Sequence, residues 1–250
     1  MQLLLTFLIL SIITVIAILL MLLNKNSRSH KIRELALKYS WQYQEFINFS
    51  DPIKEANFAI LNYSSNAIFR HAISANNDSY GLGFNFFDCR AIEAFGIHNS
   101  SIIMFNLALD IRFKTLHLSL LPQENATQQD ALQSPINSNT LAKICQQQKL
   151  TKLKHYALQK HNAFSNNNTL SEMFLQSHHL TDNEEHPLSA WLLAHPHLHI
   201  EISNGMLLAY QPNRLLDDDS IIPAINAIAD ISILLSDVKH NTELNHDKNN

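Results

Sequence analysis

The chain has 250 residues, 18 of them Lys or Arg and 22 Asp or Glu, which gives a formal net charge of −4. An acidic excess gives no reason to expect a nucleic-acid partner, because such partners are bound through clustered basic residues. Only four glycines occur, and the glycine-rich loops that cradle phosphates are missing. The cysteines Cys89 and Cys145 are too few for a disulfide framework and fit a reducing compartment, although one bridge between them stays possible.

The N-terminal segment is long and apolar. Residues 3–23 read LLLTFLILSIITVIAILLMLL and carry no charge, and about 20 such residues cross a bilayer. No Lys or Arg precedes the segment and no small-x-small cleavage site follows it, which favours an uncleaved anchor over a signal peptide. The basic stretch NKNSRSHKIR comes next, and the positive-inside rule places this side in the cytoplasm and the N-terminus outside. The lipid bilayer is therefore the expected partner of residues 3–23.

Four segments are expected along the chain. They are a transmembrane anchor (1–24), a juxtamembrane helix and connection (25–50), a cytoplasmic α+β domain (51–238) and a disordered tail (239–250). Within the second segment, residues 28–40 are predicted to be helical, because Ile32, Leu35, Ala36 and Tyr39 share one face. The sequence SWQYQEFINFSDP that follows is expected to be an aromatic-rich connection.

Strand patterns fill the first part of the domain. Residues 66–74 and 80–92 flank the turn-forming ANNDS and predict a hairpin. Residues 100–109 and 113–122 are predicted to form a further pair. In the second of these, leucines alternate with Thr, His and Ser, which predicts a half-buried strand.

The second part of the domain begins with a polar stretch, 122–139, which is either a surface loop or an interdomain linker. A short helix at 139–148 and a strand within 152–164 are expected next. Residues 185–195 predict a short helix with Pro187 in its first turn. Residues 217–239 predict an amphipathic helix with an apolar stripe at steps of three and four, made of Ile221, Ile225, Ile228, Ile231, Leu235 and Val238.

The stretch HPHLHIEISNGMLLAY, residues 195–210, predicts a hairpin. Asn204-Gly205 is a strong type I′ turn signal. The turn would set Ser203 against Met206 and His199 against Tyr210. One face then holds Leu198, Ile200, Ile202, Leu207 and Ala209, which we expect in the core. The other face is expected to be open or only partly covered and to face a partner through His199, Glu201, Met206, Leu208 and Tyr210.

Together these patterns predict an α+β fold. Most neighbouring strands have connections too short for crossovers, so the sheet should be mainly antiparallel. We expect the long C-terminal helix to pack on it.

No catalytic motif is found, and no cofactor is expected. His197 and His199 are a weak candidate metal pair, because histidines at i and i+4 of a straight strand, such as His195 and His199, lie too far apart to share one ion. A third ligand would have to come from His178, His179 or His186. Cys89 is expected to pack rather than react, and the acidic run 217–219 is explained by helix capping.

From about residue 34 onward the chain resembles a broad group of uncharacterised bacterial proteins with an N-terminal membrane anchor. The resemblance is carried by ELALKYSWQY, FRHAIS with GLGFNFFDC, LSLLP, and WLLAHPHLHIEISNGMLLAYQPNRLL before the terminal helix. It implies a single-pass protein of the bacterial inner membrane and implies no activity.

Three functions stay open. The first is a non-enzymatic scaffold or sensor at the cytoplasmic face. The second is a metal sensor or metal-dependent enzyme that uses His197 and His199. The third is the binding of a small apolar or lipid ligand between the terminal helix and the sheet.

Overall fold

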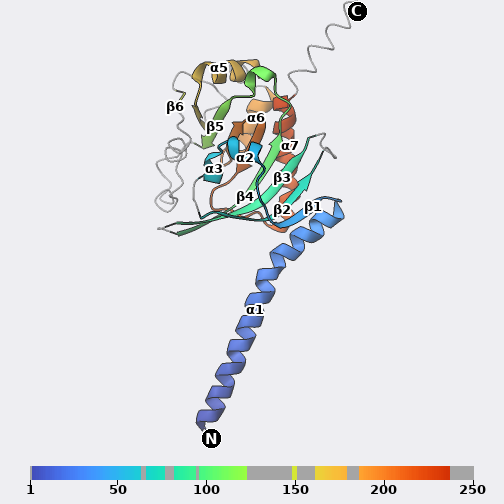
Figure 1. Ribbon diagram of the computed structural model, residues 1–250, viewed down its shortest axis with the longest axis vertical. Coiled ribbons are helices and arrows are strands. Elements are labelled where there is room, and N and C mark those ends of the chain that lie inside the picture. Colours follow the sequence, from blue (N-terminus) through green and yellow to red (C-terminus); the bar gives the residue numbers. More distant parts are fainter. Residues whose placement is uncertain are drawn as a thin grey trace, which may run out of the picture.

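The computed structural model describes residues 2–62, 66–76, 82–93, 96–122, 148–150, 161–178 and 186–236. These residues form one antiparallel sheet in the order β1-β2-β3-β4-β9-β8-β5-β7-β6 (Figure 1). The strands are β1 Gln42–Phe46, β2 Ile68–Ala75, β3 Phe84–Glu93, β4 Gly96–Asn106, β5 His117–Pro122, β6 Gln148–Lys149, β7 His161–Ser165, β8 His199–Ser203 and β9 Met206–Tyr210. The predicted α+β class with a mainly antiparallel sheet is confirmed.

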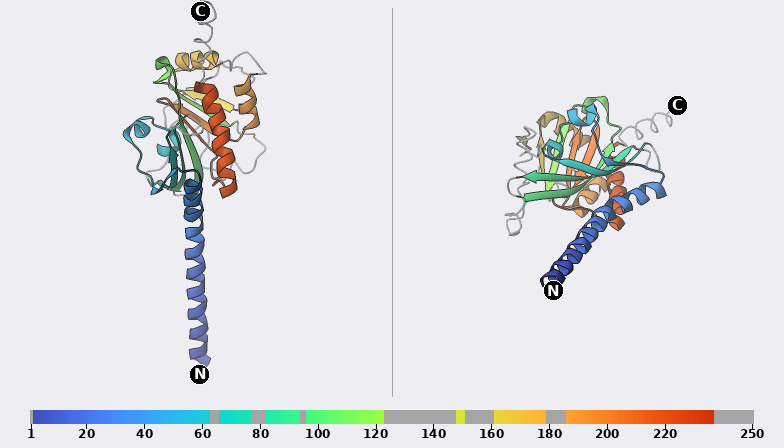
Figure 2. Two further views of the ribbon diagram at one scale, coloured as in Figure 1. Left: turned by 90° about the vertical axis from the view of Figure 1, so that its right-hand side faces the viewer. Right: turned by 60° about the horizontal axis from the view of Figure 1, so that its bottom comes forward.

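Helices cover both faces of the sheet. They are α1 Gln2–Lys38, α2 Asp51–Glu55, α3 Ala59–Asn62, the 3-10 helix η1 Ile111–Phe113, α5 Asn168–Ser177, α6 Pro187–Ala194 and α7 Asp218–Ser236. The end of α1, α5, α6 and α7 contribute to the larger apolar core on one face. The segment of α2 and α3 contributes to a smaller core on the other. Figure 2 shows α7 and the α2–α3 segment on opposite sides of the sheet.

Helix α1 runs unbroken out of the domain (Figure 1). Its last turns belong to the main core, where Ile32 and Ala36 are buried, together with Trp41 just after the helix. The sequence TrpGlnTyrGlnGluPhe, expected to be a connection, contains strand β1, which pairs with β2 at the edge of the sheet. The juxtamembrane segment expected at 25–50 is thus built into the domain from about Arg28 onward.

Helix α7 confirms the amphipathic pattern. Ile221, Ile225, Ile228, Ile231 and Leu235 of the predicted stripe are buried against the sheet, and Val238 lies outside the described residues. Among the described residues, α7 is also the helix that is long and apolar enough to cross a membrane by length and composition. Because its apolar stripe is part of the main core, packing within the domain explains that composition.

The hairpin of β8 and β9 has the predicted register, with His199 opposite Tyr210 and Ser203 opposite Met206. Asn204 and Gly205 have φ values of 50° and 72°, and a type I′ turn requires φ to be positive at both central positions.

Replacing Gly205 with alanine is expected to lower the free energy of unfolding by about 1 kcal/mol, because an L-residue is strained at positive φ. A Cβ at this position meets nothing closer than the Leu107 carbonyl oxygen at 3.7 Å, so the cost is conformational and not steric. Urea denaturation followed by tryptophan fluorescence measures it. Asn204→Gly is the control and should keep the wild-type stability; an equal loss in both variants would contradict the assignment to Gly205.

Two expectations about the middle strands are wrong. Strands β4 and β5 do not pair with each other, because the β8–β9 hairpin lies between them. Strand β5 is also not half-buried. Its residues from His117 to Leu121 are all buried, because helices lie on both faces of the sheet.

Several expectations lie largely or wholly outside the described residues. They are the polar stretch 122–139, the short helix at 139–148, the tail 239–250, Cys145 and His179. The strand expected within 152–164 is described from His161 onward, as β7.

Candidate ligand-binding cavity

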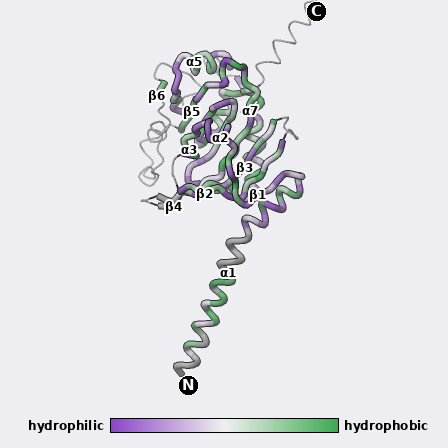
Figure 3. The backbone as a smooth tube through the Cα atoms, viewed as in Figure 1, coloured by the Kyte–Doolittle hydropathy of each residue, from purple (hydrophilic) through white to green (hydrophobic). Residues whose placement is uncertain are grey.

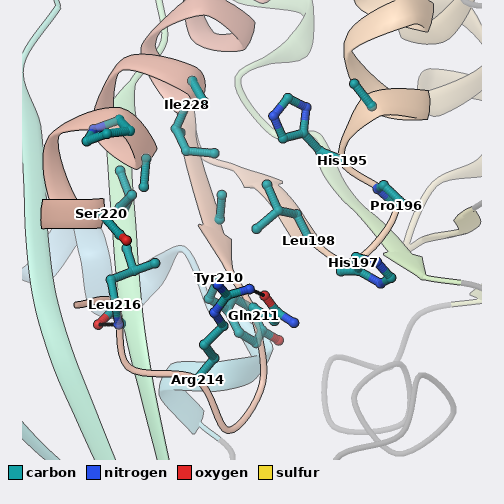
Figure 4. Close-up of a pocket in the computed structure, with 17 residues that line it drawn as sticks. His195, Pro196, His197, Leu198, Tyr210, Gln211, Arg214, Leu216, Ser220 and Ile228 are labelled. Atoms are coloured by element: carbon teal, nitrogen blue, oxygen red, sulfur yellow. Dashed lines mark hydrogen bonds between the residues drawn. The ribbon is translucent and has the colours of Figure 1, made fainter.

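A cavity of about 340 Å³ lies between α7, the sheet and the turn that joins α6 to β8 (Figure 4). We call it the α6–α7 cavity. Its lining consists of Ser101, Ile103, Ala194, His195, Pro196, His197, Leu198, Ala209, Tyr210, Gln211, Arg214, Leu216, Ser220, Pro223, Ala224, Ala227 and Ile228. This is the location at which the third hypothesis, a small apolar or lipid ligand between the terminal helix and the sheet, would place its ligand.

The walls of the α6–α7 cavity are apolar, and small residues of α7 leave the space open. Pro223, Ala224 and Ala227 line it from the helix, whereas the larger Ile225 and Ile231 of the same helix fill the core. Trp191 of α6 donates a hydrogen bond from Nε1 to the Ala227 carbonyl oxygen at 2.9 Å. This bond holds α6 and α7 together beside the cavity. The packing of the two helices therefore stabilises the shape of the cavity.

Polar groups gather at the rim. The Arg214 side chain is exposed and donates from Nη1 to Gln211 Oε1 at 2.8 Å. His195 ends α6, as predicted, and its ring stacks on Trp191 with ring centroids 4.1 Å apart. Its Nδ1 lies 2.8 Å from the Trp191 carbonyl oxygen. An exposed cation beside an apolar cavity is suited to a ligand with an apolar body and an anionic head.

One side of the cavity is tied to helix α1 by Arg28. The Arg28 guanidinium forms a two-pronged ion pair with Asp88, with Nε–Oδ2 at 2.6 Å and Nη2–Oδ1 at 2.8 Å. It also donates to the Leu216 carbonyl oxygen at 2.8 Å and to Ser101 Oγ at 3.3 Å. Both Ser101 and Leu216 line the cavity, so the helix that leaves the domain also supports the cavity wall. The pKa of Arg28 is raised: burial lowers it, and the ion pair with Asp88 outweighs that effect.

The face expected to meet a partner is instead buried. His199, Glu201, Met206, Leu208 and Tyr210 have exposed fractions of 7%, 0%, 6%, 0% and 1%. The α2–α3 segment covers this face. Its two short helices could not be predicted from apolar periodicity, because neither is long enough to show one. The prediction of an open or partly covered face for these residues is wrong.

Glu201 attaches the covering segment to the sheet. Its Oε2 accepts the backbone N–H of Ala59 at 2.7 Å, and its Oε1 lies 3.4 Å from Tyr210 Oη. Ser203 Oγ donates to the Ala56 carbonyl oxygen at 2.6 Å. Burial raises the pKa of Glu201 to about 7, although hydrogen bonds from the backbone of Ala59 and Ile60 and from Tyr210 oppose the shift. The carboxyl group has a structural role.

The structure gives no support to the metal pair. His197 is exposed and lines the α6–α7 cavity, whereas His199 is buried on β8 with its ring centroid 5.0 Å from that of Tyr210. Of the possible third ligands, His178 lies within hydrogen-bond distance of the Phe174 and Leu235 carbonyl oxygens, and His186 caps α6. No group of three or more His, Cys, Asp or Glu side chains in the described parts of the chain is arranged to hold an ion.

Cys89 is buried on β3, and burial raises the pKa of its thiol to about 12. A thiol that stays protonated at neutral pH is a poor nucleophile, which agrees with the expected packing role.

The comparisons with known proteins are sparse. No family model matches the chain, and no curated protein matches it. Among solved structures, the mycobacterial trehalose monomycolate transport factor A, TtfA, is similar with a TM-score of 0.48 and 8% sequence identity, over 83% of this chain and 95% of that one. The likeness is weak, and nothing about the function of this chain follows from it.

Proposed function

We propose that this protein is anchored in a membrane by the N-terminal part of α1 and binds a small amphiphile in the α6–α7 cavity of its cytoplasmic domain. The observation that carries the binding proposal is the cavity itself, apolar on its walls and cationic at its rim. The proposal concerns binding alone and includes no chemical reaction.

The anchor is supported by the exposure of apolar side chains on a free helix. Within α1, Phe7, Leu10, Ile12, Ile13, Val15, Ile16, Ile18 and Leu19 are each at least half exposed. Burying side chains of this kind in lipid is favourable by about 0.3 to 0.6 kcal/mol per residue. Figure 3 shows this apolar stretch and the more polar end of α1 next to the domain. The basic residues that follow the apolar stretch support a cytoplasmic domain, and the resemblance supports a bacterial inner membrane.

The size of the cavity restricts the ligand. A volume of about 340 Å³ lies at the lower end of the range for small-molecule sites, roughly 300–1,000 Å³. Each buried methylene contributes about 0.8 kcal/mol, so a single short acyl chain gains enough to bind when Arg214 also pairs with its head. A fatty acid or a single-chain lipid with an anionic head group fits these conditions.

Filling the cavity tests the proposal. Ala224→Phe should weaken the binding of lauric acid at least tenfold, because the new ring occupies the space of the chain. Isothermal titration calorimetry on the full chain in detergent-free nanodiscs measures the affinity. Ile233→Phe adds bulk at an exposed position of the same helix and should bind like the wild type. Equal affinity in all three proteins, or no binding to the wild type, would contradict the proposal.

A scaffold or sensor role at the cytoplasmic face stays a prediction. This prediction was based on the mixed polar and apolar face of the β8–β9 hairpin, which is buried. In a sensor, the α6–α7 cavity would therefore be the part of the domain that responds to a ligand.

A further inference from the structure

We infer that the loop 211–216 lies in the head-group layer of the bilayer and forms the entrance by which a lipid reaches the α6–α7 cavity. The inference rests on the proposed anchor and deepens the proposed function, because it names the membrane lipid as the source of the ligand.

The loop lies at the end of the domain from which α1 leaves. It joins β9 to α7, and Figure 2 shows the first turn of α7 next to the point where α1 enters the domain. Two contacts join α1 to this part of the domain. Arg28 Nη1 donates to the Leu216 carbonyl oxygen at 2.8 Å, and Lys31 Nζ lies 2.6 Å from Asp218 Oδ2.

The helical rise places the loop relative to the bilayer. Arg28 follows Leu23, the last residue of the apolar segment, by 28 − 23 = 5 positions, and α1 is helical throughout. At 1.5 Å per residue, Arg28 lies roughly 7 Å beyond the end of that segment. The head-group layer is roughly 5–8 Å thick on each side of the hydrocarbon core. A loop that is hydrogen-bonded to Arg28 therefore lies at the depth of the head groups.

The side chains of the loop suit this depth. Leu215 is 38% exposed, and the neighbouring Arg214 is exposed as well. An apolar side chain beside a long cation is a combination that favours the interface, where the apolar part enters the acyl boundary and the cation reaches a lipid phosphate. The acidic residues at the start of α7 follow directly, and they keep the contact shallow because burying them would be costly.

The same loop borders the cavity. Gln211, Arg214 and Leu216 line the α6–α7 cavity, whereas Leu215 does not. The neighbouring residues Leu215 and Leu216 therefore face the outer surface and the cavity respectively, so the path from the bilayer to the binding site is short. Leu215 contacts the bilayer without being part of the binding site, so the two roles can be tested separately.

Membrane contact is tested with the full chain in nanodiscs that contain brominated phosphatidylcholine. The tryptophan introduced by Leu215→Trp should add a new fluorescence component. Lipids brominated near the carbonyl group should quench this component more strongly than lipids brominated at the end of the acyl chain. Met173→Trp, on α5 at the far end of the domain and 44% exposed, is the matched control and should add an unquenched component. The native protein supplies the background of Trp41 and Trp191. Equal quenching in the two variants, or stronger quenching at the chain end, would overturn the placement.

The entrance is tested by the rate at which 12-bromododecanoic acid, a brominated analogue of lauric acid, moves from the nanodisc lipid to the protein and quenches the fluorescence of Trp191 beside the cavity. Leu215→Asp should slow the transfer about tenfold and leave the equilibrium affinity unchanged, since Leu215 does not line the cavity. An unchanged rate would overturn the entrance. If the wild type does not bind lauric acid, the proposed function is refuted. The quenching experiment would still test separately whether the loop lies in the head-group layer.

Discussion

Replacing Arg28 with alanine is expected to lower the free energy of unfolding by about 3 kcal/mol. The substitution removes both prongs of the pair with Asp88, whose side chain is only 9% exposed, and breaking a buried pair by removing one partner typically costs about 3–5 kcal/mol. The lower end applies because Arg28 is itself 22% exposed and Ser101 Oγ still donates to Asp88 at 2.7 Å. Urea denaturation of the detergent-solubilised chain, followed by Trp41 and Trp191 fluorescence, measures the loss.

A double-mutant cycle separates the pair from the packing of each side chain. Arg28→Ala combined with Asp88→Ala should cost clearly less than the sum of the two single substitutions, because the second change removes the charge that the first one leaves unpaired. Lys31→Ala is the surface control. Its pair with Asp218 is exposed, so little change is expected. Additive losses in the cycle would show that Arg28 and Asp88 stabilise the domain independently.

Replacing Glu201 with glutamine is expected to stabilise the domain progressively as pH rises from about 4.5 to about 7. The folded state keeps the Glu201 proton up to a pKa of about 7, whereas the unfolded state releases it near 4.5. Over this interval the folded wild type binds the extra proton, so its stability falls with rising pH, by about 3 kcal/mol in total. Glutamine has no proton to lose, and its Oε1 still accepts from the Ala59 amide.

The measurement is the difference in free energy of unfolding between variant and wild type from pH 4 to 8. Glu45→Gln is the control of opposite sign. Hydrogen bonds from Ser29 and Tyr43 lower the pKa of Glu45, so this substitution should reduce stability above pH 4.5. A Glu201→Gln difference that does not change with pH would show that the carboxyl group titrates normally.

Buried histidines set the acid limit of the same profile. Burial lowers the pKa of His117 to about 4 and that of His199 to about 3, from 6.5. Below pH 6.5 these two histidines are protonated in the unfolded chain but stay neutral in the folded chain. The free energy of unfolding of the wild type therefore falls as pH decreases. Glu201 acts in the opposite direction from about pH 4.5 to about 7. Below pH 6.5 the two histidines outweigh this single carboxyl group, so the stability of the wild type is expected to be highest near pH 6.5.

The features that the sequence predicts well are those with a local physical signal. Asn204-Gly205 set the β8–β9 register because the turn needs two residues that tolerate positive φ. The α7 stripe follows from the spacing of its isoleucines. Helix α5 was missed although a signal was present. Asn167 accepts the Leu170 N–H as an N-cap, and asparagine is among the residues that commonly start a helix in this way.

The errors concern long-range packing. No local pattern shows that a hairpin from residues 199–210 enters between β4 and β5, or that a short segment near Ala59 covers Glu201. Sequence considerations suggested the region of the cavity, between the terminal helix and the sheet, but not its lining. The lining combines residues from β4, α6, β9, the following loop and α7, and only the tertiary fold brings them together.

The position of the β8–β9 hairpin in the sheet has a consequence for biosynthesis. Strands β4 and β5 each expose a row of unpaired amide and carbonyl groups until residues 199–210, which follow both strands in the chain, have left the ribosome. By then the N-terminal segment has long emerged. Until then the nascent domain has two open strand edges, which are templates for wrong pairing. A chain truncated before residue 199 is expected to aggregate, because both edges then stay open for pairing with other chains.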